Sequence, residues 1–139
     1  MKRFRFSMQK ILDLRTFEQK NAEIELGKAL ATETAIQRKI ESLSQGAAAA
    51  AVAANGSVDF EYIRSTSSYI VLLKSQIYEQ TVRLAEAKVV SEQKRSVLVK
   101  AIEKKKVLEK LRDKKLEAYK KAMFKAEETA LDDVVTGRY

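Results

Sequence analysis

The basic residues of this sequence indicate most clearly that the protein binds a partner, and their excess over acidic residues is concentrated in one stretch. Residues 94–121 carry 12 basic and four acidic side chains, an excess equal to the net charge of +8 of the whole chain of 139 residues. Lys106 and Lys110 lie one helical turn apart, and a like-charged pair at this spacing destabilises an isolated helix by roughly 0.2–0.5 kcal/mol. An acidic partner would offset this repulsion, so the stretch predicts a binding surface for an acidic molecule.

Three interpretations of this basic stretch are compatible with the residues alone. An acidic protein surface would bind it, a nucleic acid or a ribosome would bind it through phosphates, and a solvated basic face needs no partner. Base readout favours Arg, Asn and Gln on a compact scaffold, whereas lysine outnumbers arginine here. Tyr119 is the single aromatic residue of the stretch, so it has neither a set of stacking aromatic residues nor a Gly-rich loop. We therefore expect protein partners, with a basic module for nucleic acid or ribosomes and a self-associating coiled coil as alternatives.

The side chains that most enzymes need are missing. The sequence has no His and no Cys, the residues that most often act as general base and thiol nucleophile and that bind zinc or iron–sulfur clusters. It also has no GxxxxGK or GxGxxG stretch that would hold a phosphate. We predict a protein that is not an enzyme and that binds no cofactor and no metal.

The composition predicts an all-α fold. The sequence has no Pro and only four Gly, so strong helix formers run without interruption. A heptad pattern over residues 6–44 predicts a first helix with an apolar seam broken by polar residues. This seam consists of Met8, Leu12, Arg15, Gln19, Ala22, Leu26, Ala29, Glu33, Ile36, Ile40 and Leu43.

A second, longer helix is predicted over residues 58–131, and its seam weakens after Leu98. Residues 45–57 form the predicted tip, because Gly46 and Asn55-Gly56 are residues that end helices and make turns. The Ala-rich stretch between them fits either a helical turn or a mobile tip, and residues 132–139 are predicted to fray. The second seam consists of Ile63, Thr66, Ile70, Leu73, Ile77, Gln80, Leu84, Ala87, Ser91, Lys94, Leu98, Ala101, Lys105 and Leu108.

Together the two seams predict a two-helix antiparallel coiled-coil hairpin that occupies residues 1–139 as a single unit. We expect the chain to reverse near Ala51, with Ser57 or Asp59 capping the second helix. This reversal would place Phe4 and Phe6 opposite residues 96–98. The helix beyond about Lys100 would then lack an intramolecular partner and would expose Leu108, Leu111, Leu116 and Met123.

No apolar run approaches the roughly 20 residues of a membrane span, and no signal-peptide core follows the basic start. We therefore expect a cytosolic protein.

Two groups of residues form a recognisable pattern. The first group is Phe4, Phe6, Met8, Ile11, Leu12, Leu14, Arg15 and Glu18. The second is Leu108-Glu109-Lys110-Leu111, then Tyr119, then Glu127-Glu128-x-x-Leu131-Asp132-Asp133. Both groups resemble the FliJ family, the stalk-like component of the flagellar type III protein export apparatus. The chain length, the lysine content and the unequal helices agree as well, so the resemblance covers nearly the whole chain.

This resemblance implies a function and partners. Members of the family look like the two-helix γ stalk of rotary ATPases, insert in the ring of the hexameric export ATPase and promote its assembly. They also contact the cytoplasmic domain of the export gate and bind substrate chaperones. The implied location is cytoplasmic and peripheral to the inner membrane, at the export gate.

The resemblance also implies two sets of contact residues. The family contacts the gate early in the second helix, and the matching candidates are Tyr69, Ile70, Leu73, Lys74 and Ile77. Leu73 lies on the predicted seam, so Tyr69 is the better candidate among them. The candidates for contact with the ATPase ring lie in the basic stretch and are Lys104, Lys105, Lys106, Lys110, Leu111, Arg112, Lys114 and Lys115.

Overall fold

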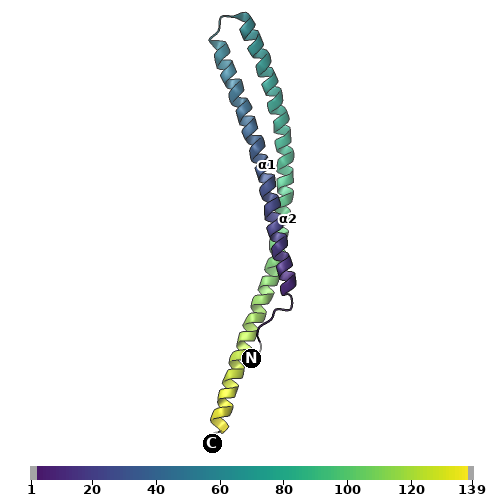
Figure 1. Ribbon diagram of the computed structural model, residues 1–139, viewed down its shortest axis with the longest axis vertical. Helices are drawn as coiled ribbons and strands as arrows, with labels where there is room; N and C mark the ends of the chain where they lie inside the picture. Colours follow the sequence, from purple (N-terminus) through teal and green to yellow (C-terminus); the bar gives the residue numbers. More distant parts are fainter. Residues whose placement is uncertain (1–2, 138–139) are drawn as a thin grey trace. The chain divides into compact units, whose positions relative to one another are not determined.

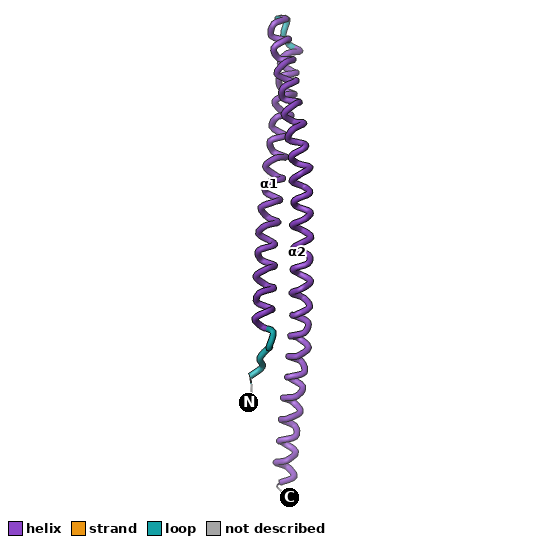
Figure 2. Tube along the Cα trace, turned by 90° about the vertical axis from the view of Figure 1, so that its right-hand side faces the viewer, coloured by secondary structure: helices purple, strands orange, loops and turns teal. Residues whose placement is uncertain are grey.

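The structure, a computed structural model, describes residues 3–137 and contains two helices, α1 (Gln9–Asn55) and α2 (Phe60–Gly137). The chain divides into two compact units: Met1–Asn21 with Leu98–Tyr139, and Ala22–Val97. In each unit a segment of α1 lies beside a segment of α2 and runs in the opposite direction (Figures 1 and 2). This arrangement confirms the predicted all-α helical hairpin with a longer second helix. That residues 1–139 fold as a single unit stays a prediction.

The predicted heptad seams are the buried faces of the helices. Every seam residue from Leu12 to Leu43 and from Thr66 to Leu108 is buried or half-buried. Met8 and Ile63, at the beginning of the two seams, are each 36% exposed. A seam at a spacing of three and four residues stays on one side of a helix, so the neighbouring helix covers it along its length.

The first helix continues through the Ala-rich stretch, so the predicted end near Ser44 and the predicted tip at residues 45–57 are wrong. Alanine has the highest helix propensity, and no glycine of the described residues adopts a positive φ. Gly46 therefore does not end the helix. It lies opposite α2, where a Cβ added to it would be 3.8 Å from a side-chain carbon of Leu73.

The turn between the helices occupies residues 56–59 and is closed by short hydrogen bonds. The backbone N–H of Ser57 donates to the carbonyl of Ala54 over 3.1 Å, and the Ser57 hydroxyl accepts from the N–H of Asp59 over 3.2 Å. The Asp59 carboxylate accepts from the N–H of Glu61 over 3.1 Å. Asp59 is therefore the N-cap of α2, as one of the two predicted possibilities stated.

The longer α1 changes which residues of the two helices meet. The Phe4 ring lies 5.5 Å from the ring of Tyr119, so the expectation that Phe4 and Phe6 face residues 96–98 is wrong. The expectation that α2 lacks a partner beyond Lys100 is also wrong, because Ala101 and Leu108 are buried. The error arose because the predicted reversal near Ala51 lies too early in the chain.

At its C-terminal end α2 is longer than predicted. It continues past Leu131 to Gly137, so residues 132–137 belong to the helix, and the predicted fraying at residues 138–139 lies outside the described residues. From Phe124 to Gly137 every residue is exposed. No helix among residues 3–137 combines the length and the apolar character needed to cross a membrane.

Replacing Gly46 with alanine should stabilise the protein by about 1 kcal/mol, because glycine is less favourable than alanine inside a helix by that amount. The added methyl would meet Leu73 at an ordinary contact distance. Thermal unfolding followed by circular dichroism measures the change. Gly27→Ala is the matched control, since nothing lies within 4 Å of its added Cβ. A rise in Tm for Gly27→Ala without one for Gly46→Ala would contradict a helical Gly46.

Candidate interaction surfaces

An aromatic and aliphatic cluster holds the N-terminal segment against α2. Phe6, Leu12 and Leu108 are buried to 7%, 3% and 9% exposure, and Phe4 and Leu111 pack against them. Phe6 precedes α1, and its carbonyl accepts a hydrogen bond of 3.1 Å from the N–H of Gln9. The chain therefore enters the helix directly from the cluster.

The same cluster is linked to the basic stretch of α2. The Lys115 ammonium lies 5.9 Å from the centre of the Phe6 ring, within the range of a cation–π interaction. The rings of Phe4 and Tyr119 are tilted by 50° to each other, a favourable geometry for aromatic pairs. The N-terminal residues thus fix the part of α2 that carries the excess positive charge.

The predicted ring-contact residues divide into exposed and half-buried ones. Lys105 and Arg112 are half-buried, and their charged groups lie 3.5 Å from Glu109 and 3.7 Å from Asp113. Leu111 is half-buried against the cluster. The exposed members of the set, which a partner can reach directly, are Lys104, Lys106, Lys110, Lys114 and Lys115.

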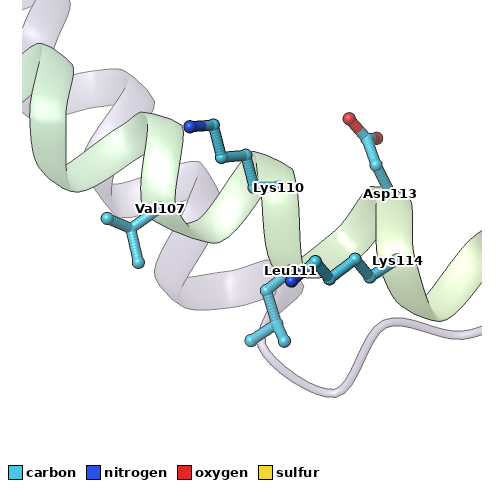
Figure 3. A pocket seen from close by; sticks show the side chains of 5 residues that line it. All are labelled: Val107, Lys110, Leu111, Asp113 and Lys114. Atoms are coloured by element: carbon cyan, nitrogen blue, oxygen red, sulfur yellow. The ribbon is translucent and has the colours of Figure 1, made fainter.

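A shallow hollow with an apolar floor lies among these lysines. It is lined by Val107, Lys110, Leu111, Asp113 and Lys114. Val107 and Leu111 extend to the same side of α2, and Lys114 runs back along the helix toward Leu111 (Figure 3). Val107 is 66% exposed. The hollow therefore presents apolar side chains beside positive charges. This surface suits a partner in which an apolar side chain lies next to an acidic one.

The five predicted gate-contact residues lie in the other unit and do not share one surface. Tyr69 is 51% exposed and Lys74 is also exposed, whereas Ile70 and Ile77 are half-buried in the seam. Leu73 is buried to 5% exposure against α1. A partner that meets the folded hairpin can therefore reach Tyr69 and Lys74, but Leu73 acts in helix packing.

The contacts of Phe4 and Phe6 with residues 108–119 were not predicted from the sequence. The sequence nevertheless contained an indication of these contacts, because Tyr119 and the apolar residues of α2 after Leu98 needed a segment to cover them. The early chain reversal hid it by moving the N-terminal residues away from this part of α2.

Replacing Phe6 with alanine should destabilise the unit that contains the cluster by about 3 kcal/mol, as expected for a buried Phe→Ala change. Hydrogen exchange should show faster opening of residues 101–119, with Ala22–Val97 much less affected. Phe17→Ala is the control, because Phe17 also belongs to the N-terminal part of the chain but is 60% exposed. Equal loss of protection along the whole chain would contradict a local role of the cluster.

Comparison with known proteins identifies the family. The family model described as flagellar FliJ protein matches residues 4–139. No curated protein and no solved structure matched the chain. The family match includes α1, the turn, α2 and the N-terminal residues of the cluster. The chain therefore belongs to the flagellar FliJ family, whose members are non-catalytic components of flagellar protein export.

Proposed function

We propose that this protein is a stalk of the flagellar export apparatus that inserts in the ring of the hexameric export ATPase and promotes its assembly. In this function the stalk couples the ring to the cytoplasmic domain of the export gate and to substrate chaperones. It acts in the cytoplasm, at the inner-membrane gate, and reaches the membrane through its partners. Membership of the FliJ family supports a role in export, and the surfaces of α2 support the finer assignment.

The observation that carries the proposal is the row of exposed lysines beside the hollow on α2. Lys104, Lys106 and Lys110 form no ion pair within residues 3–137. Their charges are therefore available to acidic side chains or backbone carbonyls of a surrounding ring. The floor of Val107 and Leu111 adds apolar area to this surface, and apolar area beside charge is the usual composition of a protein interface.

Replacing Lys104, Lys106, Lys110 and Lys114 with glutamine should weaken binding to the purified export ATPase by roughly tenfold. This estimate assumes about 0.2–1 kcal/mol for each exposed ion pair. Helix propensity hardly changes, because glutamine resembles lysine in this respect. Affinity measured by calorimetry at several salt concentrations should fall with salt for the parent and depend on it less in the variant.

The matched control removes four positive charges elsewhere, by glutamine substitution of the exposed Lys10, Lys20, Arg38 and Lys39. Equal loss of affinity in both variants would mean that net charge alone drives binding. Tight binding of the parent to nucleic acid, with no binding to the ATPase, would favour the nucleic-acid alternative. The logarithm of affinity would then fall with that of the salt concentration by about 0.9 per phosphate neutralised.

Gate binding is assigned to the exposed side of α2 that contains Tyr69. Tyr69→Ala should weaken binding to the cytoplasmic domain of the gate and leave thermal stability nearly unchanged, because the ring is 51% exposed. Val90→Ala, at a residue that is 44% exposed farther along α2, serves as the control. Pull-down with the purified gate domain measures the effect. Loss of binding in the control, or none for Tyr69→Ala, would remove Tyr69 from the gate contact.

A further inference from the structure

A second apolar stripe runs along α2 on residues that α1 does not cover. It consists of positions alternately four and three residues apart, all of them exposed and none of them charged. We call this stripe the outer seam. Its members are Val71, Ser75, Tyr78, Val82, Ala85 and Val89. Val71, Tyr78, Val82 and Val89 are 67%, 73%, 44% and 58% exposed.

The spacing of the outer seam is that of a coiled coil. Alternating steps of four and three residues keep side chains on one side of a helix over several turns, which is the requirement for packing against another helix. Val82 and Val89 occupy one heptad position, and β-branched residues at the a position favour two-stranded parallel coiled coils. A soluble helix that is already packed on one side has no structural need for a second seam.

A hollow at the end of the outer seam has the shape that such packing uses. It is lined by Lys88, Val89, Glu92, Gln93 and Ser96. In a coiled coil each side chain of one helix enters a space between four side chains of the other. Val89, Glu92 and Gln93 lie one, four and five positions after Lys88 and enclose the hollow together with it. The hollow can therefore receive a side chain from a facing helix.

The charged residues beside the outer seam indicate which helix faces it. One edge carries Lys74 and Lys88, and the other carries Glu79 and Glu86. All four are exposed, and none forms an ion pair among the described residues. An edge of each sign is the pattern of a helix that pairs with its own copy, because each positive edge then finds a negative one.

These signs also select the orientation of the two copies. In a parallel coiled coil, a residue on the lysine edge of one helix lies beside the residue five positions later in sequence on the glutamate edge of the other helix. Lys74 would then lie beside Glu79 of the second copy, and Lys88 beside Gln93 of the second copy. In an antiparallel pair the lysine edge of one helix lies beside the lysine edge of the other, so that like charges face each other. The attraction therefore favours the parallel arrangement.

We infer that two copies of this chain associate in parallel through the outer seam of α2, with Lys74 of each copy beside Glu79 of the other. The inference rests on residues 71–96 and does not depend on the proposed role in export.

Single cysteines test the arrangement, because the chain has no cysteine of its own. Ser75→Cys, Val82→Cys and Val89→Cys each place one thiol on the outer seam. In a parallel pair every seam residue faces its own counterpart, so all three variants should form a covalent dimer on mild oxidation. Gln76→Cys is the control and should not, because this exposed residue is rotated by about 100° from Ser75, away from the outer seam. An antiparallel pair would cross-link only near its crossing point, and that result would overturn the inference.

The mass in solution gives a second test. Sedimentation of the parent should reach twice the mass of one chain as the concentration rises. Val82→Asp should restore the mass of one chain with unchanged helicity, because two carboxylates would face each other only in the dimer. Lys74→Glu should raise the dissociation constant several-fold, and adding Glu79→Lys should restore it by reversing the ion pair. A parent that stays monomeric at every concentration would overturn the inference and leave the outer seam to a helix of another protein.

Discussion

The register of α1 against α2 is the constraint on which the other features depend. A heptad seam repeats, so many alignments of two helices bury similar faces. The turn at residues 56–59 selects one alignment, in which Gly46 lies against Leu73 and Phe4 against Tyr119. Had α1 ended near Ser44, the N-terminal aromatic residues would have met a different part of α2, and the basic stretch would have had no support.

Polar residues lie in the seam beside the apolar ones, and this affects where stability is located. Thr66, Gln80 and Ser91 are buried, and the Ser91 hydroxyl has no hydrogen-bond partner among the described residues. A buried polar group without a partner costs about 1–3 kcal/mol. The cluster of Phe6, Leu12 and Leu108 offers large apolar side chains instead. Stability is therefore expected to be higher around the cluster than beside Ser91.

The exposed surfaces of α2 have different chemistry, and each suits a different partner. The lysines near Val107 and Leu111 offer positive charge beside a small apolar floor. The outer seam offers an uncharged stripe with one edge of each sign. A helix packed on one side only can carry both, because its remaining sides stay free along its length. This arrangement fits a protein that works by docking, as in its proposed role.

The sequence by itself determined the all-α fold, the two seams and the position of the excess charge. These follow from local properties: helix propensity, heptad spacing and the order of charged residues. It did not determine the end of α1, because Gly46 ends a helix in some contexts and is tolerated inside one in others. Only the tertiary structure decided that the Ala-rich stretch packs as helix against α2. That packing set the register, buried Leu73 and brought Phe4 and Phe6 to the basic stretch. These contacts join residues that are distant in sequence, and local patterns such as helix propensity and heptad spacing do not predict which distant residues meet.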